Sequence, residues 1–285
     1  MSEHFLDQGR PISLLATLDA AEPEIAARLA TRHAAIAQGA STSNAVAAGL
    51  ALAAAPIALA ALARDAYGQS ARLPAAVVTI LNFALTLEHL ESDFYTMGVN
   101  ATGLIPAADR AIFTTIQQHE AQHVTTLQGL LGSSARPKPT FDFSAKGTFT
   151  DTFTNYNTFK ALAQAFEDTG VRAYKGQAPA LIPYGTVLTA ALSIHSVEAR
   201  HASEVRRLRG SFSEQAPNKG WITGNQTDLP AAANATYAGE ENLIQGGVDV
   251  STLVPGLGAG PASEAFDEPL TMAQVIAIAG NFIAG

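Results

Sequence analysis

The sequence predicts an all-α protein whose central part is a bundle of four helices. Three observations lead to this prediction. Four segments between residues 73 and 209 repeat apolar side chains at helical spacing, short turns join the segments in pairs, and a longer connection separates the two pairs. Two helical hairpins joined by a long crossover are a known topology of four-helix bundles.

The bounds of the expected helices follow from where the apolar periodicity starts and stops. Pro74 suits the first turn of a helix, and Gly132 suits a position just after a helix end. Residues 133–152 are rich in Pro, Gly, Ser and Thr with interspersed Phe, which predicts an irregular connection. The expected helices span about 74–100, 106–131, 153–176 and 185–209.

The sequence on either side of the bundle has a different character. We expect an N-terminal helical extension at 1–70, the bundle at 71–210, and a loop-rich tail at 211–285 with a short helix near 271–283. The Ala-rich stretch Ala45–Ala63 carries no charge and is long enough to span a membrane, although Pro56 would interrupt a helix. It fits a helix packed on protein, a membrane contact or a relic of an export signal, so both an exported, periplasmic protein and a cytoplasmic one stay open.

Composition excludes several classes of function. The net charge is −8 and no run of Lys or Arg occurs, which argues against a nucleic-acid partner. The absence of Cys excludes disulfides, thiolate zinc sites, iron–sulfur clusters and catalytic thiols. With 47% hydrophobic residues, the chain has enough apolar surface for one large core.

A repeated motif carries the main chemical signal. Each expected hairpin contains a Glu, a Tyr seven residues later, and then a Glu-x-x-His motif. The residues are Glu88, Tyr95, Glu120 and His123 in the first hairpin, and Glu167, Tyr174, Glu198 and His201 in the second. The two Glu residues are 32 positions apart in the first hairpin and 31 in the second. Residues three or seven apart share one helix face, and the apolar neighbours on these faces place the motif in the core.

Four core carboxylates and two imidazoles predict a site for two metal ions. An unpaired carboxylate is costly in an apolar core, whereas two divalent cations would balance the charge of four carboxylates. Without thiolates this ligand set suits iron or manganese, and its distribution over four helices is that of dinuclear carboxylate bundles. The alternative is a bundle that keeps the shape and binds no metal. The expected ligands, with no catalytic residue beyond them, are Glu88, Glu120, His123, Glu167, Glu198 and His201.

Two residues beside the motif have other expected roles. Glu91 lies one turn after Glu88 and could compete for the ligand role, but Glu88 has the matching offset to the following Tyr. His119 is adjacent to Glu120 and is therefore rotated by about 100° around the helix. We expect His119 at the surface or at an interface.

Further polar residues near the motif leave alternatives open. Tyr95 and Tyr174 fit either hydrogen bonds to ligand carboxylates or plain packing. His195, one turn before the second Glu-x-x-His motif, fits a core or supporting histidine better than a ligand. Asp168 and Arg172 are expected to face solvent.

At these residues the chain resembles the ferritin-like superfamily, and within it the ferritin-like domain family that includes desiccation-related proteins. The resemblance covers about 73–210 and 264–283 and is carried by LNFALTLEHLESDFY, QQHEAQH, AFEDTGVRAY, HSVEARHASEVRRLRG and the closing EAFDEPLTMAQVIAIAGNFI. It implies a di-iron centre at the six ligands.

Haem is not expected, because Ala121 follows Glu120 and Met occurs only at 1, 97 and 272. The twin-arginine signal common in this family is replaced here by Arg32-His33.

The resemblance implies a di-iron protein that oxidises ferrous iron or reacts with oxygen or peroxide in stress protection, as a ferroxidase or peroxidase type of oxidoreductase. Two alternatives stay open. One is a non-enzymatic structural or accessory subunit that uses the bundle as a scaffold for a partner complex or a membrane, through residues 45–63 in the latter case. The other is manganese catalase-like peroxide dismutation. A homo-oligomer or a larger complex is compatible with each of them.

Overall fold

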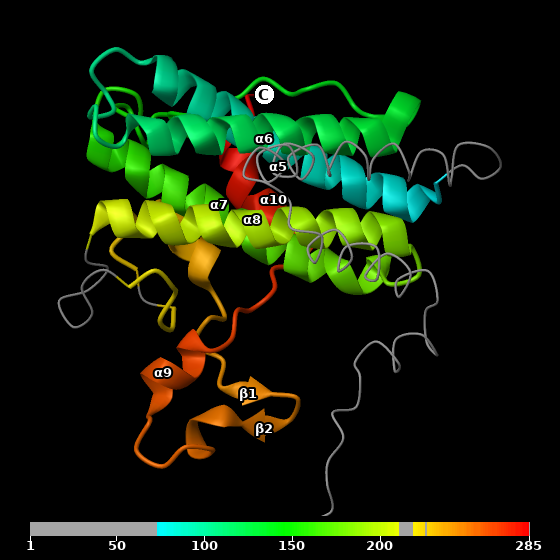
Figure 1. The fold of residues 1–285 in the computed structure, drawn as a ribbon, viewed down its shortest axis with the longest axis vertical. Coiled ribbons are helices and arrows are strands. Elements are labelled where there is room, and N and C mark those ends of the chain that lie inside the picture. Colours follow the sequence, from blue (N-terminus) through cyan, green and yellow to red (C-terminus); the bar gives the residue numbers. More distant parts are fainter. Residues whose placement is uncertain (1–72, 211–218, 226, 285) are drawn as a thin grey trace, which may run out of the picture. The chain divides into compact units, whose positions relative to one another are not determined.

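Two helical hairpins make up the bundle. The first consists of α5 (Ala75–Asn100) and α6 (Arg110–Leu131), and the second of α7 (Tyr156–Leu181) and α8 (Gly185–Arg209). Each helix packs most extensively on its hairpin partner, and the four run alongside one another (Figure 1). This arrangement confirms the all-α four-helix bundle with a long crossover that the sequence predicts.

The structure is a computed structural model that describes residues 73–210, 219–225 and 227–284. The expected N-terminal helices and the Ala45–Ala63 stretch lie outside these residues. Among the residues described, none of the helices combines the length and apolar character that a membrane span requires.

The helix bounds follow local capping chemistry, with one difference from expectation. Asn155 caps α7 by accepting a hydrogen bond from the backbone N–H of Asn157 at 3.0 Å. Gly132 and Gly210 follow the ends of α6 and α8 with φ of 53° and 85°, values that favour glycine. The third helix was expected to end near 176, but α7 continues through Pro179 to Leu181. Pro179 has no N–H to donate to the preceding turn, and α7 ends two residues after it.

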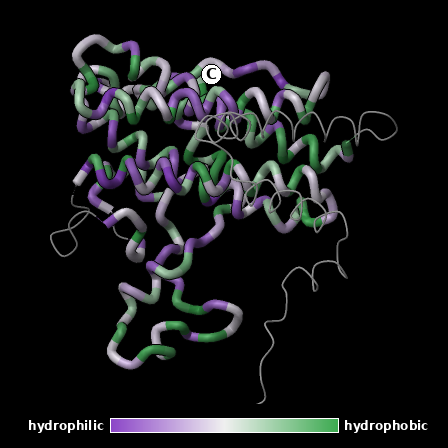
Figure 2. The backbone as a smooth tube through the Cα atoms, viewed as in Figure 1, coloured by the Kyte–Doolittle hydropathy of each residue, from purple (hydrophilic) through white to green (hydrophobic). Residues whose placement is uncertain are grey.

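Apolar side chains form two clusters at opposite ends of the bundle. One lies where α5 ends and α7 begins. It includes the stacked rings of Phe94 and Phe159, whose centroids are 4.7 Å apart. The other lies where α5 begins and α6 ends, and it includes Leu81 and Leu127. Figure 2 shows hydrophobic and hydrophilic residues interleaved along the long helices, as expected for helices with one buried face. The Glu and His residues of the repeated motif lie in the middle of the bundle, between the two clusters, to which the motif tyrosines belong.

The C-terminal part contains more regular structure than the expected loop-rich tail. Its short elements are η2 (Ala231–Tyr237), β1 (Ile244–Gln245), β2 (Val248–Asp249), η3 (Val250–Thr252), α9 (Ala259–Glu264), α10 (Met272–Ala279) and η4 (Gly280–Phe282). Strands β1 and β2 form an antiparallel hairpin. A capping box between Thr271 and Gln274 starts α10. The chain end after α10 pairs with the crossover, since Phe141 and Ile283 form an antiparallel bridge.

Two residues expected to face solvent, Asp168 and Arg172, are buried instead. The guanidinium of Arg172 donates hydrogen bonds to the carbonyl oxygens of Ala238 and Glu268, each at 2.7 Å, and pairs with Glu240 at 2.8 Å. The sequence-based expectation was wrong because it considered only the bundle. The face of α7 that points away from the motif is covered by the C-terminal part of the chain.

Asp168 is held on the same covered face of α7. It pairs with Arg206 of α8 and accepts a hydrogen bond from the hydroxyl of Tyr237 at 2.5 Å. Gly176 lets the tail approach further, since a Cβ there would lie 1.9 Å from the carbonyl oxygen of Leu270. Helix α7 is therefore enclosed by other helices on one side and by the tail on the other.

We predict that Arg172→Ala lowers the free energy of unfolding by about 3 kcal/mol, because it leaves the buried Glu240 without its partner. Urea denaturation of the full chain measures this change, and limited proteolysis should cut the tail faster. Arg200→Ala, an exposed change on α8, serves as control and should shift the free energy of unfolding by less than about 0.5 kcal/mol. Equal stabilities of the two variants would contradict the role assigned to Arg172.

Candidate metal centre

The six residues predicted as ligands lie together in the middle of the bundle, one from α5, one from α7, and two each from α6 and α8. The four carboxylates are completely buried, and the two histidines are 5–6% exposed. The residues are Glu88 on α5, Glu120 and His123 on α6, Glu167 on α7, and Glu198 and His201 on α8. The apolar clusters on either side keep this layer from water.

Their side-chain atoms form two overlapping groups, each with the residue types and proximity that a metal site needs. One group is Glu88, Glu120, His123 and Glu198, and the other is Glu120, Glu167, Glu198 and His201. Within each group, one ligand atom from each residue lies within 4.8 Å of those of the others. Glu120 and Glu198 belong to both groups, so these two carboxylates can bridge two ions.

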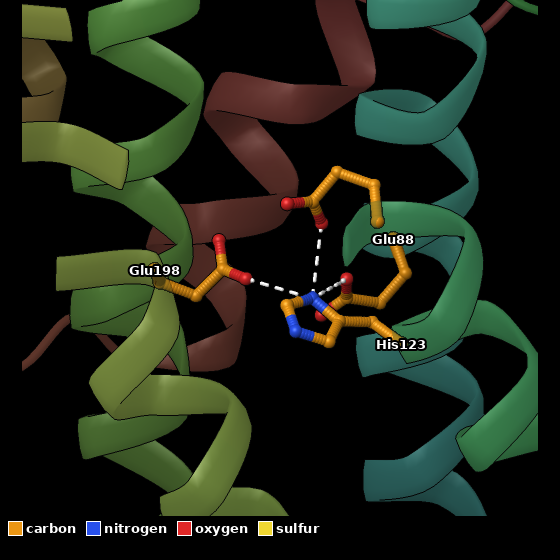
Figure 3. A group of neighbouring side chains, drawn as sticks. Glu88, His123 and Glu198 are labelled. Atoms are coloured by element: carbon orange, nitrogen blue, oxygen red, sulfur yellow. Dashed lines mark hydrogen bonds and ion pairs between the residues drawn. The ribbon is translucent and has the colours of Figure 1, made fainter. Parts of the chain in front are cut away.

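His123 shows how crowded the first group is with acceptors. Its Nδ1 lies 3.1 Å from Oε2 of Glu88, 3.1 Å from Oε2 of Glu120 and 3.0 Å from Oε1 of Glu198. Figure 3 shows the carboxylates of Glu88 and Glu198 converging on this nitrogen from different helices. One ring nitrogen carries at most one hydrogen, so it cannot donate to three oxygens. A cation at the centre would attract all three carboxylates.

His201 occupies the corresponding place in the second group. Its Nδ1 lies 2.9 Å from Oε1 of Glu120 and 3.2 Å from Oε2 of Glu167. Its Nε2 lies 2.9 Å from Nδ1 of His119, and the two rings are stacked. His119 is exposed, as the sequence predicts, yet it also contacts a site histidine from outside. Such outer partners fix the tautomer of a histidine that binds metal through its other nitrogen.

The two tyrosines of the motif bind carboxylates across the hairpins. The hydroxyl of Tyr95 donates to Oε1 of Glu167 at 2.5 Å, and that of Tyr174 donates to Oε1 of Glu88. Of the two alternatives left open by the sequence, the structure shows hydrogen bonds to the predicted ligands. Because each tyrosine orients the Glu of the other hairpin, the two halves of the site hold each other in register.

His195 lies away from the six residues. Its Nδ1 bonds to the backbone carbonyl of Val171 at 2.9 Å, and it lines a cavity with Asp267 and Trp221 on the tail side of α7 and α8. Among the described contacts, none links His195 to the cluster. Glu91 differs from His195, because the carboxylate of Glu91 lies inside the bundle close to that of Glu198.

Burial and mutual repulsion raise the pKa values of the carboxylates in the cluster, whereas attraction to the two histidines lowers them. Burial raises the pKa of Glu88 to about 7, and burial with the charges of Glu120 and Glu88 raises that of Glu198 well above its ordinary range. Burial acts to raise the pKa of Glu120 too, but His123 and His201 outweigh it and lower this pKa. Although burial opposes it, Glu167 and Glu120 raise the pKa of His201 to about 11. The protein alone therefore supplies only two imidazolium charges to four carboxylates.

The unpartnered atoms of the cluster fit two metal ions. Oε1 of Glu120 and both carboxylate oxygens of Glu198 are buried and accept no well-aligned hydrogen bond within the described residues. The two Oε1 atoms lie within 3.0 Å of a histidine nitrogen that is shared with other carboxylates, whereas Oε2 of Glu198 has no such neighbour. Buried oxygens without donors are rare in folded proteins, because each costs free energy. They belong to the two residues shared by both groups. Oxygen and imidazole donors are the ligands that iron and manganese accept.

The contact between His119 and His201 was missed from the sequence. The position equivalent to His119 in the second hairpin is Val197, so the repeat that revealed the other residues gives no signal here. The relevant signal is the packing of α6 against α8, which brings a residue beside Glu120 onto the outer edge of the His201 ring.

Comparison with known protein families matches residues 76–211 to the ferritin-like domain. The matched region contains all four long helices and all six residues of the cluster. No curated protein gives a significant match to the chain.

We predict that Tyr174→Phe lowers the free energy of unfolding of the metal-free protein by about 2 kcal/mol, because it removes a buried hydrogen bond to the Glu88 carboxylate. Chemical denaturation in the presence of a chelator measures this change. Tyr184→Phe is the matched control, since the Tyr184 hydroxyl makes no hydrogen bond within the described residues. A loss of similar size in both variants would assign Tyr174 a packing role only.

Proposed function

We propose that the ferritin-like domain of this chain binds two iron ions and uses them to oxidise ferrous iron with dioxygen or peroxide. The observation that supports the proposal most is the pair of overlapping Glu/His groups sharing Glu120 and Glu198. The shared carboxylates have buried oxygens that accept no well-aligned hydrogen bond within the described residues, and four carboxylates match the charge of two divalent ions.

Some residues of the cluster would bind the ions, and others would position the ligands. Glu88 and His123 would serve one ion, Glu167 and His201 the other, and the shared carboxylates both. Tyr95 and Tyr174 would keep Glu167 and Glu88 aimed inward through their hydrogen bonds. The positions are set by helices rather than loops, which suits a site of fixed geometry.

The bound ions would supply the redox chemistry. Two ferrous ions give up two electrons, which together with two protons reduce dioxygen to hydrogen peroxide or hydrogen peroxide to two water molecules. The chain contains no cysteine for a second iron centre of the thiolate type, so the electrons would come from ferrous iron itself or from a partner. Removing ferrous iron and peroxide together would protect a cell under oxidative stress, including the stress of desiccation.

Manganese fits the same ligand set, and in that case peroxide disproportionation to water and dioxygen would be the activity. Metal analysis of the purified protein identifies the bound metal. Activity assays separate the two reactions, because the iron reaction consumes ferrous iron while the manganese reaction releases dioxygen from peroxide alone. Binding to a partner complex or to a membrane remains an expectation for the full chain.

We predict that the full chain binds two Fe²⁺ per molecule without air and oxidises added Fe²⁺ faster than buffer does on exposure to air. Glu198→Ala should lower the rate at least about tenfold, because Glu198 belongs to both groups. Metal analysis and the absorbance rise of ferric iron measure stoichiometry and rate. Glu204→Ala, on the same helix and outside the groups, is the matched control and should behave like the wild type.

Circular dichroism shows whether each variant is folded before it is assayed. Metal content near zero in folded wild-type protein supplemented with iron would overturn the proposal. Two bound ions without faster iron oxidation would support the proposed metal site and overturn the proposed activity.

A further inference from the structure

Glu91 is a fifth buried carboxylate beside the candidate site. It lies on α5 one turn after Glu88 and is 2% exposed. Its Oε2 atom has no hydrogen-bond partner among the described residues, and no ion pair seen in that part of the chain includes it. A buried ionised carboxylate without a donor or a cation is costly, and a bound cation would remove that cost.

The Glu91 carboxylate points toward the candidate site. A Cβ built on Gly170 of α7 would lie 3.3 Å from Oε1 of Glu91 and 2.8 Å from Oε2 of Glu198. The two carboxylates therefore lie around the same point, in the space that the missing side chain of Gly170 leaves open. Glu198 is one of the two carboxylates shared by both groups.

The internal repeat shows that this space is specific to one side of the site. Glu91 follows Glu88 by three residues, and Gly170 follows Glu167 by three, so the two occupy equivalent positions in the two hairpins. The second hairpin thus has no counterpart of the Glu91 carboxylate. It has a glycine that makes room for it instead.

The surroundings of Glu91 toward α10 offer no stronger polar partner. Glu91 and Gly170 both line a small cavity there, and apolar side chains form most of its wall, including Leu90 of α5, Phe166 of α7 and Ile278 of α10. The one side-chain hydroxyl that lines it, that of Thr169, already bonds to the carbonyl of Ala165 at 2.6 Å. The strongest available partner for the carboxylate is therefore a cation on the Glu198 side.

We propose that Glu91 is a fifth carboxylate ligand of the metal site, held beside Glu198 in the space provided by Gly170. This inference rests on the proposed function, because it requires metal in the site. Four carboxylates balance the charge of two divalent ions. A fifth carboxylate adds a negative charge, which offsets part of the positive charge gained when the ions become trivalent. Glu91 would thus favour the oxidised state of the site.

The test compares Glu91→Gln with the wild type in titrations with Mn²⁺, which does not oxidise readily in air. We expect Glu91→Gln to bind Mn²⁺ at least about tenfold more weakly, because glutamine keeps the shape and loses the charge. Asp93→Asn removes the same charge on the same helix at a surface ion pair with Lys138, and it should leave the affinity unchanged.

A second readout reports coordination directly. Visible absorption of Co²⁺-loaded protein depends on the number and geometry of ligands, so its spectrum should change in Glu91→Gln and stay unchanged in Asp93→Asn. Gly170→Ala gives an independent variant, since its Cβ would displace Glu91 or Glu198. We expect it to weaken Mn²⁺ binding as well.

The outcomes separate the two proposals. Wild-type protein that binds neither Mn²⁺ nor Fe²⁺ would overturn the proposed function and this inference together. Two ions bound with equal affinity and equal Co²⁺ spectra in the wild type and Glu91→Gln would overturn the ligand role of Glu91 alone. Weaker binding and an altered spectrum in Glu91→Gln, with Asp93→Asn unchanged, would support it.

Discussion

Repulsion among buried carboxylates is the constraint on which the rest of this structure depends. Five of them, including Glu91, lie between two apolar clusters, and only two imidazoles stand close to them as bases. The free energy of desolvating these groups in their ionised form is recovered through hydrogen bonds or through cations in their midst. Tyrosine hydroxyls donate to two of the carboxylates, whereas Glu120, Glu198 and Glu91 each keep at least one oxygen that accepts no well-aligned hydrogen bond among the described residues.

The bundle and the tail both contribute to holding this layer together. Each hairpin supplies half of the ligands, and the tyrosine of one half orients a glutamate of the other, so the site requires both hairpins in one register. The tail acts on the opposite face of α7, where Arg172 and Asp168 bind backbone and side-chain groups of the C-terminal part. Helix α7 is thereby fixed from both sides, which also fixes Glu167 and Gly170.

Most of the fold and the membership of the cluster could be predicted from the sequence because they depend on helical periodicity and on an internal repeat. Glu-x-x-His and the tyrosine at plus seven share a helix face whatever the surroundings are. Contacts made between elements carry no such pattern. His119 bonding to His201, Arg172 bonding to the tail, and Glu91 facing Gly170 each depend on how helices and tail pack. The sequence left Glu91 as a rival of Glu88, whereas the structure places Glu88 in the cluster and the Glu91 carboxylate beside it, next to Glu198.

The most direct test of the two-metal site is an anomalous difference map. The crystals would be grown from the full chain with Fe²⁺ or Mn²⁺, and the diffraction data collected at the absorption edge of the metal. We expect two peaks between the four long helices, one beside His123 and one beside His201, with Glu120 and Glu198 between them. A map without peaks in the bundle, or with peaks only at surface carboxylates, would contradict it.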